Sequence, residues 1–178
     1  MSEISRRRFL TTVAAAAPLV ATPRLLFADP LAPRALNFTH THTGERLAIE
    51  YFRGGSYEPE ALATVNHFLR DFRTGDVHVI DEQLLDLLHS LADVTNTRRP
   101  FQVISGYRSP ATNQMLRQHS EGVAAGSLHM RGQAIDIRLA DIPLARLRGA
   151  ALSLERGGVG FYPASDFVHV DTGRVRRW

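Results

Sequence analysis

Two histidines and an aspartate in the C-terminal part of the chain, His129, Asp136 and His169, have side chains of the types that bind a metal ion. Zinc accepts imidazole nitrogen and carboxylate oxygen, and catalytic zinc sites use three protein ligands and leave a fourth position to water. The chain has no cysteine, so a zinc ion here must be bound through nitrogen and oxygen. A single histidine on a half-apolar strand is more often a hydrogen-bonded structural residue than a ligand. The spacing alone therefore leaves both interpretations open.

Two predicted strands are needed to bring these side chains together. Residues 134–137 alternate in a pattern typical of a strand, with Asp136 on one face and the flanking isoleucines pointing into the core. In residues 167–171, His169 and Asp171 share one face, and the two valines take the other. Two such strands side by side would bring His169 close to Asp136.

Three separated motifs resemble one enzyme family. They are Ser-x-His-x-x-Gly-x-Ala-x-Asp at residues 127–136, Ser-Gly-Tyr-Arg-Ser at 105–109, and Gly-Val-Gly-Phe-Tyr-Pro at 158–163 followed by His-Val-Asp-Thr-Gly at 169–173. They occur in the order found in the M15 metallopeptidases, and the last resembles the YcbK/MepK murein endopeptidase branch. The resemblance covers residues 35–178. It implies a Hedgehog/D-Ala-D-Ala peptidase fold, zinc bound by the three residues named above, and a peptidoglycan substrate.

The same resemblance suggests roles for residues around the predicted zinc site. Asp166 stands three residues before His169, as the general base does in the Glu/Asp-x-x-His pattern of M15 enzymes. Asp171 is the alternative base, or else a residue that orients a metal ligand through a hydrogen bond. Arg108 either pairs with a surface carboxylate or binds a substrate carboxylate or amide oxygen through its planar guanidinium group. The resemblance favours substrate binding, and it adds Ser127 to that role.

Composition and charge exclude some classes of protein. A chain of 178 residues can form one domain with a real core, and its 44% hydrophobic and 22% charged residues are typical of a soluble globular protein. The formal net charge of +3 comes from residues 1–28, which hold four of the 21 basic residues and one of the 18 acidic residues. The rest of the chain has equal numbers of both, so charge predicts no binding to nucleic acid or to a membrane surface.

Residues 1–28 have the features of an export signal. A basic segment, Ser5 to Leu10, with paired arginines before Phe-Leu, precedes a short apolar run from Thr11 to Ala21. This resembles a twin-arginine signal, which is recognised by a translocase that exports folded proteins. An uncleaved anchor is the alternative, but the run is broken by Pro18 and is shorter than the roughly 20 residues that span a bilayer. We therefore expect a periplasmic protein without membrane insertion, in which residues 29–34 form a linker.

The remaining pattern predicts one α+β domain over residues 35–178. Two alternating apolar stretches in residues 35–52 indicate a hairpin, and His40 and His42 near its turn are expected on the surface. Apolar residues at helical spacing predict four helices, over residues 58–72, 81–94, 110–119 and 142–154. A short apolar run predicts a buried strand over residues 101–104. We expect a central, mostly antiparallel sheet covered by helices.

Three functions are compatible with these features. The first is an exported zinc-dependent endopeptidase that hydrolyses amide bonds in the peptide cross-links of peptidoglycan. A D,D- or L,D-carboxypeptidase acting on the same polymer is the nearest alternative, and a non-catalytic cell-wall-binding module is a different class. Three candidate ligands together with Asp166 favour an enzyme, because a binding role does not need a coordination position open to water.

Overall fold

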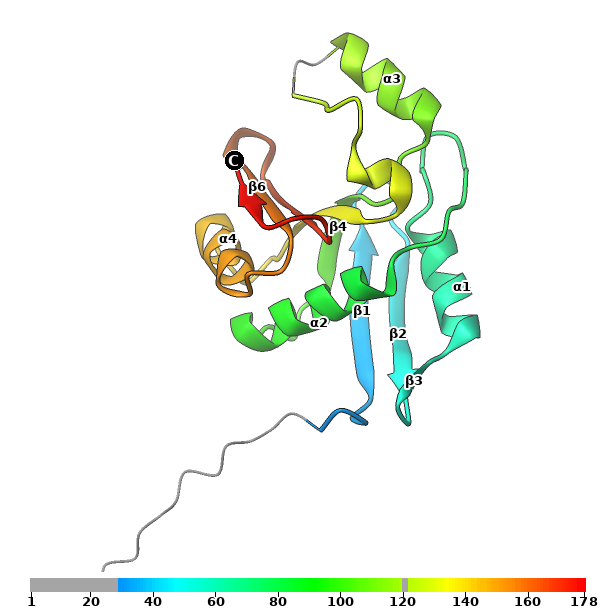
Figure 1. Cartoon of the computed structure of the whole chain (residues 1–178), viewed down its shortest axis with the longest axis vertical. Coiled ribbons are helices and arrows are strands. Elements are labelled where there is room, and N and C mark those ends of the chain that lie inside the picture. The colour runs from blue at the N-terminus through cyan, green and yellow to red at the C-terminus, as the bar shows by residue number, and fades with distance from the viewer. Residues whose placement is uncertain (1–28, 120–121) are drawn as a thin grey trace, which may run out of the picture.

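The described residues form one eight-stranded sheet (Figure 1). The computed structural model describes residues 29–119 and 122–178, so the predicted export signal lies outside the described residues. The strands are β1 (Arg34–His40), β2 (Arg46–Arg53), β3 (Ser56–Tyr57), β4 (Phe101–Ser105), β5 (Ala134–Arg138), β6 (Gly158–Tyr162), β7 (Phe167–Asp171) and β8 (Arg176–Arg177).

The order of the strands in the sheet is β3-β2-β1-β4-β5-β7-β6-β8. Two neighbouring pairs are parallel, β1 with β4 and β6 with β8, and the other five pairs are antiparallel. The predicted mostly antiparallel sheet is therefore confirmed. The centre of the sheet, where β5 lies between β4 and β7, joins segments that are far apart in the sequence.

Within residues 29–119 and 122–178, four α-helices accompany the sheet: α1 (Pro59–Phe68), α2 (Glu82–Thr95), α3 (Pro110–His119) and α4 (Leu144–Ser153). Helix α2 begins where the Asp81 side chain accepts a hydrogen bond from the Gln83 backbone N–H, and it ends at Asn96 in the left-handed conformation. Its leucines are buried in the core. Helix α1 packs on β2, α2 packs on β1 and α4, and α4 packs on β6 and β7. The α+β fold class is thus as predicted.

The hairpin of β1 and β2 is confirmed, but one prediction about it is wrong. His40 is only 1% exposed, because it lies on the same inward face of β1 as Phe38 and packs edge-on against Phe68 and Phe72. Burial, reinforced by the neighbouring His42, lowers the pKa of His40 to about 4. His42 itself is exposed, as expected.

The first strand begins at Arg34, one residue before the predicted domain boundary. The Arg34 guanidinium lies 2.6 Å from the Asp86 carboxylate of α2, and the same carboxylate accepts hydrogen bonds from the hydroxyls of Tyr51 and Tyr57. Strands β1, β2 and β3 are thereby attached to one helix. In the part of the chain that the structure describes, no helix has both the length and the apolar character needed to cross a bilayer.

Candidate metal centre

The predicted ligands on the two strands lie side by side at the centre of the sheet. Asp136 of β5 is in register with His169 of β7, and His169 is in register with Gly160 of β6. Ile135 and Ile137 face the opposite way and are fully buried in the core. The alternation predicted for both strands is therefore present, and it presents one carboxylate and one imidazole on the face away from the core.

A short 3-10 helix, η1 (Leu128–Arg131), brings His129 to this face. The helix ends at Gly132, which has a φ of 66°, a conformation that glycine adopts without strain. A Cβ at Gly132 would also lie 2.1 Å from the carbonyl oxygen of Val79, so no larger residue fits there. The sharp turn lets the chain pass directly from His129 into β5.

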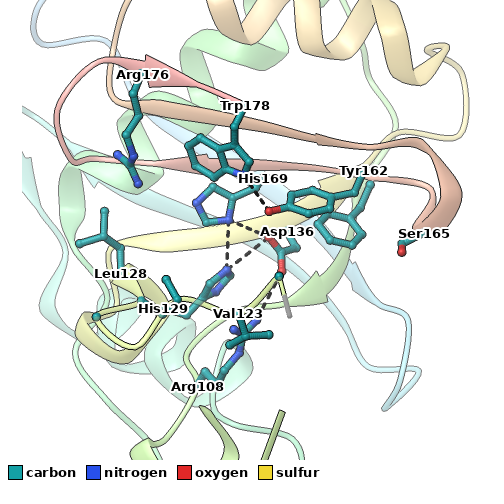
Figure 2. Close-up of a pocket in the computed structure, with 15 residues that line it drawn as sticks. Arg108, Val123, Leu128, His129, Asp136, Tyr162, Ser165, His169, Arg176 and Trp178 are labelled. Carbon is teal, nitrogen blue, oxygen red and sulfur yellow. Dashed lines mark hydrogen bonds and ion pairs between the residues drawn. The ribbon is translucent and has the colours of Figure 1, made fainter. Parts of the chain in front are cut away.

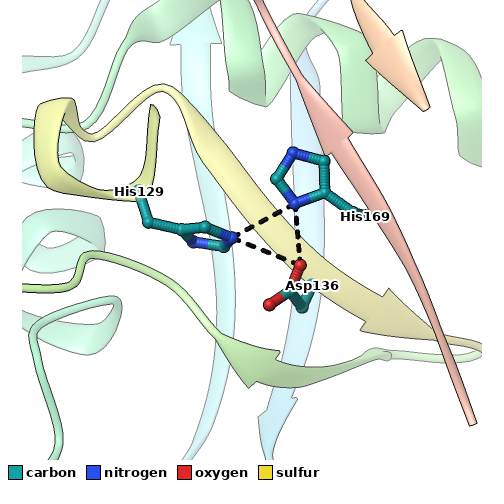
Figure 3. Close-up of side chains that lie close together, drawn as sticks. All are labelled: His129, Asp136 and His169. Carbon is teal, nitrogen blue, oxygen red and sulfur yellow. Dashed lines mark hydrogen bonds and ion pairs between the residues drawn. The ribbon is translucent and has the colours of Figure 1, made fainter. Parts of the chain in front are cut away.

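The three side chains converge on one point (Figure 3). His169 Nδ1 lies 2.9 Å from Asp136 Oδ1, His129 Nε2 lies 3.3 Å from the same oxygen, and the two ring nitrogens are 3.2 Å apart. All three residues are buried, and each offers one donor atom within 4.8 Å of the others. Two imidazole nitrogens and one carboxylate oxygen are a donor set that a divalent transition metal accepts.

The outer nitrogen of each histidine has a defined partner. His129 Nδ1 is 2.7 Å from the carbonyl oxygen of Gly106, and His169 Nε2 is 3.0 Å from Asp171 Oδ2. A carbonyl oxygen and an ionised carboxylate can accept hydrogen bonds but cannot donate them. His129 Nδ1 and His169 Nε2 therefore carry protons. The inner nitrogens, His129 Nε2 and His169 Nδ1, then face the point where a metal ion would lie, and a bound metal would take the place of a proton on His169 Nδ1. The residues present therefore fit a bound metal.

Charge at the cluster favours a cation. Burial alone would raise the pKa of Asp136, but the adjacent His129 and His169 outweigh it and hold that pKa well below its ordinary value. Burial would lower the pKa of His169, whereas its hydrogen bonds to Asp136 and Asp171 raise it to about 9, so without a metal ion the ring carries a proton on each nitrogen, and metal binding would release the one on Nδ1. Asp136 is thus ionised in the folded protein and supplies negative charge to the cluster.

Asp171 is fully buried and has no free oxygen. Its Oδ1 accepts from the backbone N–H groups of Gly158 and Gly173, and the Arg176 guanidinium binds both carboxylate oxygens at 2.8 and 3.1 Å. Burial would raise the pKa of Asp171, but its hydrogen bonds, the largest of them from His169, keep the pKa well below the usual range. This geometry fits the predicted orienting role and leaves no free oxygen for a base.

The cluster lies in a cleft of about 470 Å³ (Figure 2). The cleft is bounded by the segment before η1, by Arg108 and by the C-terminal strands. The residues that line it are Arg108, Gly122, Val123, Ala124, Gly126, Ser127, Leu128, His129, Asp136, Tyr162, Ser165, Phe167, His169, Arg176 and Trp178. A buried metal-binding cluster in an open cleft is the arrangement of a site that acts on a ligand from solution.

Comparison with known proteins agrees with the motifs and the cluster. Residues 29–178 match the family model described as peptidoglycan L,D-endopeptidase MepK. The chain belongs to the MepK family. The peptidoglycan L,D-endopeptidase MepK of Escherichia coli (strain K12) is 45% identical over 178 residues, which cover 99% of this chain and 98% of the relative. The probable peptidoglycan L,D-endopeptidase MepK of Haemophilus influenzae is 42% identical over 161 residues, 90% of this chain and 82% of the relative.

Membership of the MepK family makes the protein a hydrolase of the M15 peptidase type. The family relation also implies a metal ion, and the buried His-Asp-His cluster is the group of described residues that can hold it. Among the described residues, the only carboxylate that lines the cleft is that of Asp136. The other polar side chains that line this MepK-type cleft, and that can contact a peptide, are therefore mainly hydrogen-bond donors.

Arg108 is one of these donors. Its backbone N–H binds the carbonyl oxygen of His129, and its Nη2 lies 3.6 Å from Asp136 Oδ2. Its Nε is buried and has no hydrogen-bond partner among the described residues. Burial lowers the pKa of Arg108, and the charge of Asp136 partly offsets this. Ser127 also lines the cleft, and its hydroxyl does not cap η1.

Asp166 lies apart from the cluster. Its side chain is 63% exposed and forms an ion pair with Arg138 at 2.7 Å, and the residue does not line the cleft. The chain turns through a left-handed conformation at Asp166, after the short helix η2 (Pro163–Ser165), so the strand alternation that orients His169 does not extend to this residue. The predicted role of Asp166 as general base therefore does not fit this geometry.

The cleft residues that were not predicted from the sequence include Tyr162, Arg176 and Trp178. Tyr162 could have been found, because alternation along β6 places it on the same face as Gly160 and hence as His169. Arg176 and Trp178 come from β8 and the residue after it. That strand has only two residues and no periodic signal, so its position could not be inferred from the sequence.

Proposed function

We propose that this protein is an exported, zinc-dependent endopeptidase that hydrolyses amide bonds in the peptide cross-links of peptidoglycan. The observation that carries the proposal is the convergence of His129, Asp136 and His169 in an open cleft. The relatives are named peptidoglycan L,D-endopeptidases, which supports an amide between an L- and a D-configured centre as the bond cleaved. The export-like pattern of residues 1–28 supports action in the periplasm, where this polymer lies.

Zinc is the metal we propose. The nitrogen and oxygen donors suit it, and a set of three protein ligands leaves a coordination position for water or substrate. When bound, zinc would polarise an amide carbonyl and lower the pKa of a water molecule towards neutrality. His129 Nε2, Asp136 Oδ1 and His169 Nδ1 are the atoms that would hold it.

The protein groups around the cluster keep these donor atoms in the correct state. The Gly106 carbonyl holds the proton of His129 on Nδ1, and the Asp171 carboxylate holds the proton of His169 on Nε2. Neither ring can turn away without losing its hydrogen bond. We propose that the Arg108 guanidinium, whose Nε has no partner among the described residues, donates hydrogen bonds to an oxygen of the substrate peptide, and that Ser127, which also lines the cleft, contacts the same peptide.

The proposal is tested with purified mature protein, digested peptidoglycan and mass analysis of the muropeptides. We expect cross-linked dimers to disappear, a chelator to stop this reaction, and zinc to restore it. His169→Ala should abolish both zinc binding and cleavage. The matched control is His89→Ala, since His89 lies on α2 and its ion pair with Asp93 is on the surface; this variant should keep both properties.

Two outcomes would contradict the proposal and favour a different function. Release of terminal residues from monomeric stems, with dimers left intact, would make the protein a carboxypeptidase. Zinc-loaded protein that binds cell wall but cleaves no muropeptide would make it a binding module.

A further inference from the structure

Two aromatic side chains that have no role in the proposed metal site form one wall of the cleft. The indole Nε1–H of Trp178 donates a hydrogen bond to the hydroxyl oxygen of Tyr162 at 2.7 Å. Both residues line the cleft, and Trp178 is 47% exposed. Figure 2 shows the pair on the opposite side of the cluster from Arg108, with the Tyr162 hydroxyl turned towards Trp178 and His169.

The position of the Trp178 indole requires a residue without a side chain in the strand beneath it. The Trp178 backbone N–H binds the carbonyl oxygen of Val159, and its carbonyl accepts from the N–H of Phe161. Between these two residues lies Gly160, where a Cβ would come within 2.8 to 2.9 Å of three indole atoms. The indole therefore lies over Gly160, next to His169 in the adjacent strand, and the two ring centroids are 5.3 Å apart.

The Tyr162 ring is also held in place. It stacks on Phe167 with ring centroids 4.6 Å apart, and Tyr162 and Phe167 are in register between β6 and β7. The ring lies two residues along β6 from Gly160, on the same face, which is a rise of about 7 Å. A tyrosine side chain extends over a similar length, so its hydroxyl can reach the space above the cluster.

The phenol proton of Tyr162 points away from Trp178. An indole N–H can only donate, so in its bond with Trp178 the Tyr162 oxygen is the acceptor. The phenol proton must point in another direction, and among the described residues no hydrogen bond has Tyr162 as its donor. Tyr162 is therefore a donor beside the cluster, and its oxygen is fixed by the ring stack and by the indole.

We propose that the Tyr162 hydroxyl donates its hydrogen bond to the carbonyl oxygen of the amide that is cleaved, and that Trp178 is the residue that positions this proton. The inference rests on the proposed function. The carbonyl oxygen gains negative charge when water adds to the amide, so a donor already aimed at it stabilises the transition state more than the bound substrate. The phenol keeps its proton, and no bond to Tyr162 forms or breaks.

The test compares single and double variants in the muropeptide assay. Tyr162→Phe keeps the ring and its stack on Phe167 but removes the hydroxyl, and we expect kcat to fall roughly 100-fold while KM changes little. Trp178→Phe keeps an aromatic ring but removes the N–H that orients the phenol, and we expect a loss of about 10-fold in kcat. The double variant should be no worse than Tyr162→Phe, because Trp178 acts through the hydroxyl.

The control variant removes a phenol hydroxyl elsewhere. Tyr57 lies on β3 and does not line the cleft; Tyr57→Phe breaks its hydrogen bond to Asp86 of α2 and should leave kcat unchanged. Zinc content should be the same in all variants, since none of these residues touches a predicted ligand through a hydrogen bond. Trp178 is the single tryptophan of the chain, so fluorescence of the protein without substrate reports on its bond to Tyr162, and we expect the emission of Tyr162→Phe to differ from that of the wild type.

Three results would overturn the inference: an unchanged kcat in Tyr162→Phe, losses that multiply in the double variant, or an unchanged emission spectrum. Multiplying losses would instead indicate that the indole contacts the substrate directly. Failure of the proposed function is recognised separately, because the wild type would then cleave no cross-linked muropeptide in the same assay.

Discussion

Replacing Asp171 with asparagine should weaken metal binding although Asp171 is not a predicted ligand. In the wild type, Oδ2 accepts the Nε2 proton of His169 at 3.0 Å, while Oδ1 accepts from Gly158 and Gly173. Asparagine has one oxygen and one NH2 group. If its oxygen replaces Oδ1 and satisfies the two glycine N–H groups, its NH2 group replaces Oδ2 and faces both His169 and the Arg176 guanidinium, which loses its 2.8 Å hydrogen bond to Oδ2.

An NH2 group at that place favours the other tautomer of His169. Nε2 would become an acceptor, and the proton would move to Nδ1, the nitrogen that faces Asp136 Oδ1 at 2.9 Å. A metal ion would then have to bind the less favoured tautomer of the neutral ring, whereas the neutral ring of the wild type already has its one proton on Nε2. Loss of a group that orients a ligand typically costs about 10- to 100-fold in metal affinity, which corresponds to about 1.4 to 2.8 kcal/mol.

The assay is a zinc titration against a chelator of known affinity, followed by the muropeptide assay at low and at saturating zinc. We expect Asp171→Asn to bind zinc 10- to 100-fold more weakly and to recover part of its activity when zinc is in excess. The control is Asp93→Asn, which changes the same atoms in an exposed aspartate paired with His89 and should bind zinc like the wild type. Zinc affinity equal to that of the wild type in Asp171→Asn would refute the tautomer argument.

Three further predictions concern groups around and away from the cleft. Arg108→Lys keeps the charge but loses the planar fork and the unpartnered Nε, so kcat/KM should fall at least about 10-fold at unchanged zinc content; equal kcat/KM would remove Arg108 from substrate binding. Asp166→Asn should stay within about twofold of the wild type in kcat, because its carboxylate is exposed and paired with Arg138, whereas loss of a general base costs about 10²- to 10⁴-fold. His40 has a pKa of about 4 in the folded protein against about 6.5 in the unfolded chain. The unfolded state therefore binds the proton first as the pH falls, and the free energy of unfolding should drop by at most about 3 kcal/mol from pH 6.5 to pH 4. Denaturant titrations should show this drop in the wild type and a smaller one in His40→Leu; equal pH dependence in both would count against it.

Much of the fold followed from local patterns. Helix α2 was predicted to within a residue at each end, because Asp81 is a capping side chain and the leucines repeat at helical spacing. The faces of β5 and β7 were also predicted, since alternation along a strand needs only the strand itself. The burial of His40 was missed, because its surroundings come from Phe68 and Phe72, which are distant in the sequence and close only after α1 packs on β2.

The sequence by itself predicted the donor set, His129, Asp136 and His169, through its resemblance to the M15 enzymes. It also predicted the sheet face on which the last two lie, because strand alternation is a local property. Only the tertiary structure decided which nitrogen of each histidine faces the cluster, since this depends on Gly106 and Asp171 as hydrogen-bond acceptors. It also separated Asp166 from the site and brought Trp178 into it. Packing between distant segments sets the direction of a side chain beyond a turn, such as Asp166, and the neighbours of a two-residue strand such as β8. Neither leaves a periodic signal along the chain.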